Sequence, residues 1–410
     1  MSKTWTNARL RPVLAAGFAM TLVLGAVAPG AAFEQPQDGV YADHIDWGLT
    51  TDMSGPASAA QLIWHNGFQA YMRTLNAKGG VLGRKINVLA EDTRYDATLE
   101  RIAYEKFVSQ TPALGTSGMG NSAAQVALLP LIKREKLPVL GTYASAKVSI
   151  DPPNPYFFGG FCGFKEMAQV GVGFFTDHLK LTQPKVAVVH LDVPSGKEYA
   201  GYAEAAVAAR GGTMKSIPIK VVAADATPQV LEIAAMKPDF VAIHGVPTTA
   251  ILVMKAMQQY GLDIPTFAIT YLGTPGVYQS LGPQVGKQYY FVSCFTPASV
   301  DEKAAKDLAA AADKEGFSAQ KDDVNFVAGW VAGQLVSDAL AKVGPEPTRA
   351  KLVEMLNAGF EIDSHGLSSH LKYTAESHAG LSVLKPFLYD YNAKKFKTFG
   401  DYKDFEKYLK

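Results

Sequence analysis

The chain has 410 residues, of which 48% are hydrophobic and 19% are charged, and its formal net charge at pH 7 is +1. This length and apolar content are enough for more than one hydrophobic core, so about two domains are expected. A net charge so close to zero gives no basic footprint and argues against a nucleic-acid-binding protein.

The first 32 residues have the pattern of a secretory signal peptide. Three basic residues precede an apolar stretch at 13–28, and small residues end the segment at Ala32. An uncleaved membrane anchor is the alternative, although the stretch is short and rich in alanine. No cysteine lies near the cleavage point, so no lipid anchor is expected. We expect a soluble protein, exported to a bacterial periplasm, whose mature chain begins near Phe33.

Short apolar runs then alternate with amphipathic segments along most of the mature chain. The segments Gln61 to Asn76 and Leu99 to Val108 are expected to be helices. The apolar runs are typical of parallel strands covered on both faces, and the alternation predicts βαβ units, that is, an α/β fold. The predicted strands are 45–49, 86–90, 138–141, 186–190, 240–244 and 265–270.

The character of the chain changes after residue 300. Helical stretches at 301–342 and 348–357 precede strand-like pieces around 369–373, 386–391 and 395–399. There is no low-complexity linker and no repeat of fixed period. These features predict two lobes of similar make-up that are joined by short hinge strands.

One glycine-rich motif opens a predicted helix. The segment 118–123, Gly-Met-Gly-Asn-Ser-Ala, fits the G-x-G-x-x-A pattern of dinucleotide-binding folds. The acidic residue expected at the end of the next strand is missing, because that strand runs into Thr142 and Tyr143. Contact with an anion at the helix start is favoured over a nucleotide, and plain turn geometry is the alternative.

Catalytic and metal-binding motifs are missing from the sequence. We find no H-E-x-x-H, G-x-S-x-G or P-loop pattern, so neither an enzyme nor a cofactor is expected. His365, His370 and His378 cluster loosely, but no Cys or carboxylate pair completes a metal shell. His190 and His244 each end a predicted strand, where a ligand-facing and an ordinary loop position are equally open.

The segment from Ile45 to Asp92 carries a resemblance to a known family. Its Thr-Asp-Met-Ser-Gly-Pro at 51–56, its Asn-Ala-Lys-Gly-Gly-Val-Leu-Gly at 76–83 and its Glu-Asp at 91–92 resemble the branched-chain amino-acid type (type I) of periplasmic solute-binding proteins of ABC importers. The likeness covers most of the mature chain. It implies two Rossmann-like lobes, a ligand cleft and three hinge crossovers, with lobe 1 at 43–160 and 295–365 and lobe 2 at 161–294 and 366–410.

The resemblance also implies which residues contact a ligand. The family's grip on a ligand carboxylate falls near Asn121 and Ser122 and near Tyr143 to Ser145, where N–H and O–H groups are suitable donors. The expected ligand-binding residues are Ser54, Ala60, Gln61, Asn121, Ser122, Tyr143, Ala144 and Ser145 on one wall, and Phe164, Lys165, Tyr199, Val246, Thr248 and Tyr271 on the other.

Two departures from the family bear on the ligand. In place of the acidic residue that holds an amino acid's ammonium, this chain has Thr270-Tyr271-Leu272, and a desolvated ammonium without a counter-charge costs several kcal/mol. In place of a bulky aromatic residue it has Ala60, which leaves room. A larger organic acid is therefore favoured, an aromatic one included, with Lys165 or Lys197 as a counter-charge.

Two cysteines fall in the expected crossovers of this fold. Cys162 lies near the first crossover, at 159–163, and Cys294 near the second, at 292–295. Hinge strands run side by side, so the two Cα atoms are expected within disulfide range. A disulfide and a buried reduced pair both remain open.

The sequence therefore predicts a monomeric periplasmic protein without catalysis, cofactor or metal, which captures a small organic ligand and delivers it to the permease subunits of an ABC importer. Binding of a branched-chain or other amino acid is one alternative. A ligand sensor for a membrane signalling partner is another.

Overall fold

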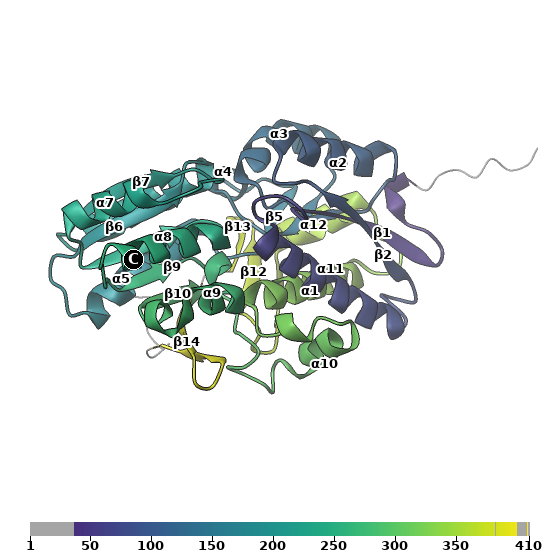
Figure 1. The fold of residues 1–410 in the computed structure, drawn as a ribbon. Helices are drawn as coiled ribbons and strands as arrows, with labels where there is room; N and C mark the ends of the chain where they lie inside the picture. Colours follow the sequence, from purple (N-terminus) through teal and green to yellow (C-terminus); the bar gives the residue numbers. More distant parts are fainter. Residues whose placement is uncertain (1–36, 382, 400–407, 409–410) are drawn as a thin grey trace, which may run out of the picture. The chain divides into compact units, whose positions relative to one another are not determined.

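The structure, a computed structural model, describes residues 37–381, 383–399 and 408 (Figure 1). The predicted signal peptide and its cleavage near Ala32 lie outside the described residues. Among the described residues, none of the helices combines the length and the apolar character that crossing a bilayer requires.

The first lobe is built on a parallel sheet with the strand order β2-β1-β3-β4-β5. The interior strand β1 is buried almost throughout, as expected of a strand with helices on both faces. The strands are β1 (His44–Thr51), β2 (Lys85–Asp92), β3 (Thr116–Gly118), β4 (Val139–Thr142) and β5 (Phe157–Gly159).

The second lobe is built on a seven-stranded sheet with the order β15-β14-β10-β9-β8-β6-β7. Five of its strands are parallel, whereas β14 and β15 add an antiparallel pair at one edge. The strands are β6 (Lys185–Leu191), β7 (Thr213–Ile219), β8 (Phe240–His244), β9 (Thr266–Ala268), β10 (Tyr289–Ser293), β14 (Lys385–Asp390) and β15 (Lys395–Thr398).

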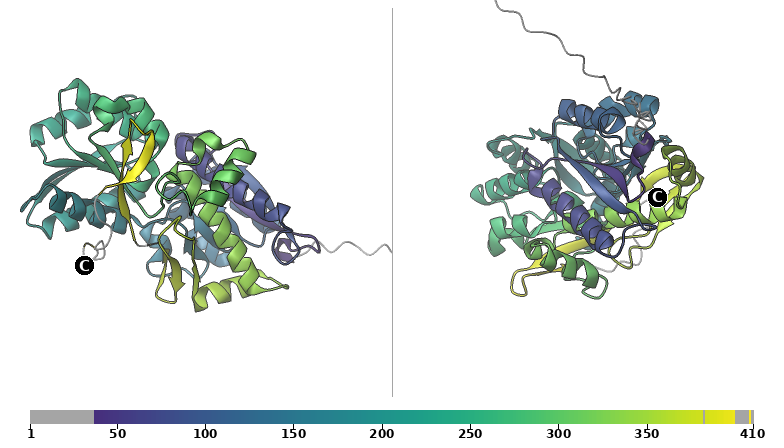
Figure 2. Two further views of the ribbon diagram at one scale, coloured as in Figure 1. Left: turned by 90° about the horizontal axis from the view of Figure 1, so that it is seen from below. Right: turned by 90° about the vertical axis from the view of Figure 1, so that its right-hand side faces the viewer.

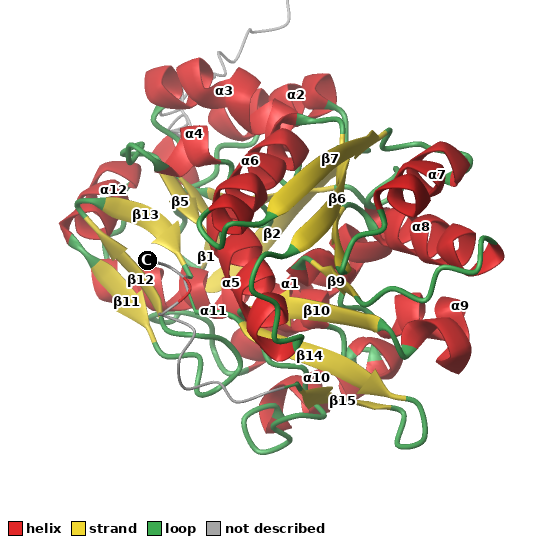
Figure 3. Ribbon diagram, turned by 90° about the vertical axis from the view of Figure 1, so that its left-hand side faces the viewer, coloured by secondary structure: helices red, strands yellow, loops and turns green. Residues whose placement is uncertain are grey.

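Helices cover both sheets. In the second lobe, α5 and α6 lie on one face of the sheet and α7, α8 and α9 on the other (Figure 3). The helices are α1 (Ser58–Ala77), α2 (Ala97–Ser109), α3 (Ser122–Glu135), α4 (Lys147–Ile150), α5 (Phe164–His178), α6 (Pro194–Ala208), α7 (Thr227–Met236), α8 (Pro247–Gln259), α9 (Pro275–Gly286), α10 (Lys306–Lys314), α11 (Val324–Val343) and α12 (Arg349–Ala358), with short 3-10 turns at Gln37–Gly39, Thr270–Leu272 and Ser318–Gln320.

The helices α10 to α12, which follow β10 in sequence, belong to the first lobe. There α11 packs along α1, and Figure 2 shows these green helices against the purple N-terminal elements. Two glycines permit this close approach. A Cβ on Gly67 would lie 2.1 Å from the carbonyl oxygen of Phe326, and one on Gly329 would lie 1.9 Å from that of Trp64. Both distances are far below ordinary contact, so the two backbones could not come this close with larger residues.

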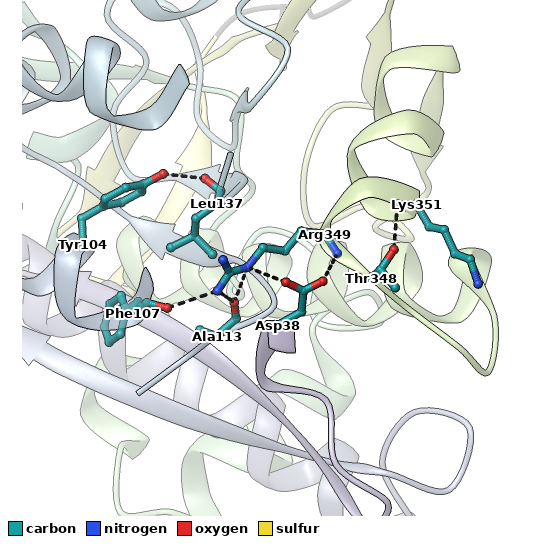
Figure 4. Close-up of polar contacts among 8 residues, drawn as sticks. All are labelled: Asp38, Tyr104, Phe107, Ala113, Leu137, Thr348, Arg349 and Lys351. Carbon is teal, nitrogen blue, oxygen red and sulfur yellow. Dashed lines mark hydrogen bonds and ion pairs between the residues drawn. The ribbon is translucent and has the colours of Figure 1, made fainter. Parts of the chain in front are cut away.

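Arg349, at the start of α12, ties this returning segment to the first sheet (Figure 4). Its guanidinium donates to the carbonyl oxygen of Ala113 at 2.7 and 2.9 Å and to that of Phe107 at 3.3 Å. The backbone N–H of Arg349 donates to Asp38 at 3.1 Å, and the guanidinium lies 3.4 Å from the same carboxylate. One half-buried side chain thus fixes α12, the loop before β3 and the first described turn together.

A small antiparallel sheet, β11 (Phe360–Ile362), β12 (Leu371–Thr374) and β13 (Ser377–Gly380), extends the first lobe. The hydroxyl of Tyr373 donates to the carbonyl oxygen of Gly159 at the end of β5. His378 packs on Phe158 with ring centroids 4.3 Å apart. The lobe boundary expected between 365 and 366 falls between β11 and β12 of this sheet, whereas the chain returns to the second large sheet only between β13 and β14, because β12 and β13 pair with β11.

In the described part of the chain, three segments run between the two large sheets, after β5, after β10 and before β14. The first and third segments lie side by side, because Cys162 and Leu381 form a parallel β-bridge between them. Cys162 and Cys294 form a disulfide with Cα atoms 6.0 Å apart. The predicted α/β fold with two lobes and three hinge crossovers is confirmed.

The predicted strands and most predicted helices are present, with boundaries shifted by a few residues. The expected helical region 301–342 is divided into α10, a 3-10 turn and α11. The strand expected at 265–270 ends at Ala268 and continues as the 3-10 turn Thr270–Leu272. This turn brings Tyr271 to the cleft.

Candidate ligand-binding cavity

A cavity of about 40 Å³ lies between the two lobes, at the carboxyl ends of strands from both large sheets. We call it the interlobe cavity. Its position is the one at which open α/β sheets hold their ligands. The first lobe contributes Ala57, Ala60, Gln61, Tyr95, Gly120, Tyr143 and Ala144, and the second contributes Phe164, Leu191, Ser195, His244, Gly245, Val246, Pro247 and Tyr271.

Aromatic rings from both lobes wall the interlobe cavity. The rings of Tyr143 and Tyr271 lie 5.0 Å apart across the lobes. Phe164 packs at 6.3 Å from Tyr271 and, edge to face, at 5.3 Å from His244. Tyr95 completes the aromatic wall on the side of the first lobe. Such rings offer large apolar faces and, in tyrosine, a polar tip.

The N-termini of five helices meet at the interlobe cavity. Residues within the first turn of α1, α5, α6 and α8 line it, and Gly120 lies two residues before α3. The first N–H groups of a helix have no partner within the helix, and its dipole places positive partial charge there. The cavity therefore has a positive electrostatic character that comes from the main chain.

Among the described residues, no Asp, Glu, Lys or Arg lines the interlobe cavity. Its one titratable cationic candidate is His244, and burial, together with His190 nearby, lowers the pKa of His244 to about 3. The imidazole is consequently neutral at physiological pH. A ligand that enters the cavity meets fixed dipoles and rings, and no formal side-chain charge.

Two buried polar atoms in the wall have no hydrogen-bond partner among the described residues. They are the hydroxyl of Tyr271 and Nδ1 of His244, and these side chains are only 6% and 3% exposed. The hydroxyl of Tyr199 is also buried and has no hydrogen-bond partner among the described residues. The ring of Tyr199 lies 5.5 Å from that of His244. Leaving such groups unpaired costs free energy, so each is suited to accept a partner from a ligand.

Gln61 is positioned by the loop before α1. Its Oε1 accepts a 2.9 Å hydrogen bond from the N–H of Asp52, whose carboxylate in turn accepts from Gly55 and Ala57. Gly120 leaves space for the amide of Gln61, since a Cβ there would lie 2.5 Å from Nε2. Asn121 caps α3 and donates to the carbonyl oxygen of Tyr95 at 2.6 Å.

A buried polar chain holds Tyr143 and Tyr271 in place. The hydroxyl of Tyr143 donates to Oδ1 of Asn325 at 2.8 Å, and Nδ2 of Asn325 donates to the carbonyl oxygen of Tyr271 at 3.3 Å. Asp323 accepts from both the N–H and Nδ2 of Asn325. Burial raises the pKa of Asp323 to about 7. Asn325 on α11 thus links the hydroxyl of Tyr143 in the first lobe to the main chain of Tyr271 in the second.

Two further contacts between the lobes lie near the interlobe cavity, besides the hydrogen bond from Asn325 to Tyr271. The N–H of Ser195 donates to Oγ of Ser122 at 3.2 Å. The N–H of Lys147 donates to the Glu198 carboxylate at 3.0 and 3.2 Å. Burial raises the pKa of Glu198 to about 7. These contacts stabilise the closed arrangement of the lobes.

The structure brings half of the expected ligand-binding residues to the interlobe cavity, namely Ala60, Gln61, Tyr143, Ala144, Phe164, Val246 and Tyr271. The other half do not line it. Asn121 and Ser122 lie directly behind it, at the start of α3, and Tyr199 packs on His244. Ser145 is buried beside Thr142, with 3.3 Å between the hydroxyl oxygens.

Three expected residues lie on the protein surface. The hydroxyl of Ser54 donates to Asp92 at 2.6 Å, outside the interlobe cavity. Thr248 is exposed and lines a separate groove beside Thr274. Lys165 is exposed because its position on α5 faces solvent, and Lys197 is also exposed and pairs with Asp192 at 3.0 Å. Neither lysine lies at the cavity to supply a counter-charge.

Two lining residues were not among the expected ligand-binding residues: Tyr95, which the sequence did not indicate, and His244, for which a ligand-facing position had been left open. His244 is the last residue of a predicted strand, and this position was the sequence feature that indicated a place near the ligand. Tyr95 has a positive φ of 58°, as does its neighbour Arg94 at 49°. This turn after β2 directs Tyr95 inward, and its conformation has no signature in the sequence.

Of the loosely clustered histidines, His378 is buried and its Nδ1 lies 2.9 Å from the carbonyl oxygen of Asn154. His365 and His370 are exposed beside Asp363 and Glu361, at 3.4 and 3.2 Å. Within the described part of the chain, no group of three or more His, Cys, Asp or Glu residues is arranged to hold a metal ion.

Residues 45–384 match the family model described as periplasmic binding protein, and this match spans both lobes and the interlobe cavity. The chain belongs to the periplasmic binding protein family. The resemblance to the branched-chain type of solute-binding proteins is confirmed. Membership implies a small-molecule ligand and an extracytoplasmic location. No curated protein matches the sequence.

Solved structures of this family share the fold. A fatty acid ABC transporter substrate-binding protein from Thermomonospora curvata is 19% identical, with a TM-score of 0.79, over 90% of this chain and 95% of that one. A branched-chain amino-acid ABC transporter protein from Thermus thermophilus, with bound valine, is 16% identical, with a TM-score of 0.77, over 88% and 96%. A leucine-binding protein from Thermotoga maritima is 18% identical, with a TM-score of 0.70, over 87% and 98%.

Proposed function

We propose that this periplasmic binding protein captures a small organic acid in the interlobe cavity and delivers it to the permease subunits of an ABC importer. The observation that carries the proposal is the make-up of the cavity, where five helix N-termini and several aromatic rings meet and no charged side chain of the described residues is present. The dipoles and free N–H groups at helix starts favour an anionic group such as a carboxylate.

The same cavity disfavours a free amino acid. Its ammonium would enter a wall in which, among the described residues, no carboxylate is present and His244 is neutral. Burial of an ammonium without a counter-charge costs several kcal/mol. An acid with an apolar or aromatic body instead packs on Tyr143, Phe164 and Tyr271.

Uptake requires the lobes to separate. The interlobe cavity of about 40 Å³ is far smaller than the roughly 300 Å³ of a typical small-molecule site. The ligand would enter an open form and shift the population toward a closed form by contacting both walls. The hydrogen bonds from Ser195 to Ser122 and from Lys147 to Glu198 would form on closure.

The proposal includes a monomer that is exported with cleavage near Ala32 and performs no catalysis. The lobes would meet at the three hinge segments, after β5, after β10 and before β14. The alternative of a sensor subunit requires the same fold and cleft, so the partner distinguishes the two. Pull-down from membranes with purified permease or with a sensor ectodomain as bait would identify it.

A thermal-shift screen of the mature protein with aromatic acids, aliphatic acids, amino acids and amides tests the ligand class. A ligand at one hundred times its dissociation constant adds about 2.7 kcal/mol to the free energy of unfolding. We expect acids to raise the melting temperature and amino acids to have little effect. A response to amino acids alone would overturn the organic-acid assignment, and no response to any small molecule would overturn the binding function.

A further inference from the structure

The wall of the interlobe cavity in the second lobe carries an unused set of hydrogen-bonding atoms. Nδ1 of His244 and the hydroxyl of Tyr271 line the cavity, are buried, and have no partner among the described residues. Phe164 contacts both residues, with its ring 5.3 Å from that of His244 and 6.3 Å from that of Tyr271. The buried hydroxyl of Tyr199 lies behind His244.

We propose that His244 and Tyr271 form a subsite for an uncharged hydroxyl group, so that the preferred ligand is a hydroxylated organic acid. This inference rests on the proposed function and specifies the end of the ligand that faces the second lobe. The acidic end would then face the helix N-termini of the first lobe.

A hydroxyl group matches this wall better than the other common polar groups. A neutral imidazole presents either a donor or an acceptor at Nδ1, and a tyrosine hydroxyl does both. A ligand hydroxyl also donates and accepts, so it is able to pair with either side chain whichever nitrogen of His244 carries the proton. A carbonyl can only accept, and thus fits one of the two tautomers.

Charged groups fit this wall less well. An ammonium would have no counter-charge, because no Asp or Glu among the described residues lines the interlobe cavity. A second carboxylate would compete with the first for the same helix dipoles without a cationic side chain to pair with. A methyl group would leave both buried atoms unpaired, with the cost that such atoms carry.

Isothermal titration calorimetry on two matched series tests the subsite. One series is 4-methylbenzoate, 4-hydroxybenzoate, 4-(aminomethyl)benzoate and terephthalate. The other is pentanoate, 5-hydroxypentanoate, 5-aminopentanoate and glutarate. We expect the hydroxy acid of at least one series to bind about tenfold or more tightly than its three counterparts.

Variants assign this preference to the two side chains. Tyr271→Phe and His244→Leu should bring the ratio of affinities for the hydroxy acid and its methyl or unsubstituted counterpart close to one. His244→Gln, which keeps a donor and an acceptor, should retain most of the preference and covers the case in which His244→Leu does not fold. Tyr260→Phe, at the exposed end of α8, is the matched control and should leave the ratio unchanged.

The outcomes separate the subsite from the function on which it rests. Binding of acids without any preference for a hydroxyl would overturn the subsite and leave the proposed function in place. A preference that survives Tyr271→Phe and His244→Leu would also overturn it. Failure of every acid to bind the wild-type protein would overturn both the function and the subsite.

Discussion

Oγ of Ser122, in the first turn of α3, accepts a 3.2 Å hydrogen bond from the N–H of Ser195, in the first turn of α6. The two helices belong to different lobes, so this bond forms only when the lobes are together. Both serines are nearly fully buried. Ser122 was expected from the sequence to contact a ligand, and its observed partner is instead the opposite lobe.

Ser122→Ala should weaken ligand binding without disturbing the fold of either lobe. The loss of one hydrogen bond of the closed form costs about 0.5–1.5 kcal/mol, which is about a 2- to 12-fold higher dissociation constant. Calorimetry with the best acid from the screen measures it. Ser109→Ala, on the exposed end of α2, is the control. An unchanged dissociation constant would show that this bond does not contribute to closure.

Ala60→Phe should block closure. Ala60 is 2% exposed and lines the interlobe cavity, which is too small to accept a phenyl ring at this position. Overpacking of this kind costs about 1–3 kcal/mol where the lobes are closed. We expect no ligand-induced compaction by small-angle X-ray scattering and no thermal shift. Ala59→Phe, at the exposed neighbouring position, should respond like the wild type; compaction of Ala60→Phe with ligand would contradict the prediction.

Glu100→Gln should change how stability depends on pH. Glu100 is fully buried, and this burial raises its pKa from 4.5 to about 7 although Thr50 and Thr93 beside it favour the charged form. The folded state therefore binds this proton more tightly than the unfolded state. The tighter binding of this proton stabilises the folded state, and this stabilisation is fully present below about pH 4.5. It is lost as the pH rises through 7 and amounts to roughly 3 kcal/mol of the free energy of unfolding.

Urea unfolding at pH 5 and pH 8 measures this effect. The free energy of unfolding of the wild type should fall more from pH 5 to pH 8 than that of Glu100→Gln. The variant should therefore be more stable relative to the wild type at pH 8 than at pH 5. Glu198 and Asp323 also have raised pKa values, so the variant should reduce the pH dependence rather than remove it. Glu105→Gln, on the outer side of the same helix, is the control. A parallel dependence in wild type and Glu100→Gln would contradict the assignment.

The hinge disulfide should stabilise the protein. Cys162 and Cys294 are 132 residues apart, so the bond closes a long loop, and its removal in Cys162→Ser/Cys294→Ser should cost about 2–5 kcal/mol. Chemical unfolding measures the loss. Intact-mass analysis after denaturation and alkylation without reductant should show no added alkyl group, whereas a reduced control should gain two. Two groups without reductant would rule out the bond.

The strands that the sequence predicted are the continuous apolar runs, such as β1, β6 and β8, since a buried parallel strand has an apolar residue at nearly every position. The edge strand β7 was missed because its residues are mostly exposed and it contains Pro218. β3 and β5 have only three residues each, too few for any periodicity. Their positions depend on neighbouring strands rather than on their own sequence.

The location of the cavity at the ends of the strands could be predicted from the sequence, whereas the residues that line it could be predicted only in part. Tyr143, Phe164 and Tyr271 follow strands or hinge segments and were expected, and all three line the interlobe cavity. Lys165 was expected as a counter-charge, but the direction of its side chain depends on how α5 is rotated against the sheet. Tyr95 depends on a left-handed turn after β2. Such rotations and turns arise from tertiary packing.

The attraction of the interlobe cavity for an anion would originate in peptide groups at the starts of five helices, and every sequence that keeps these helices keeps those groups. Side-chain substitutions in the wall would then alter the size and shape of the acid that fits, while the preference for an acid persists. Homologous proteins could therefore differ in the acid that they bind through substitutions of the aromatic residues alone. The dissociation constant should also respond weakly to added salt, because no side-chain ion pair is broken when the acid leaves.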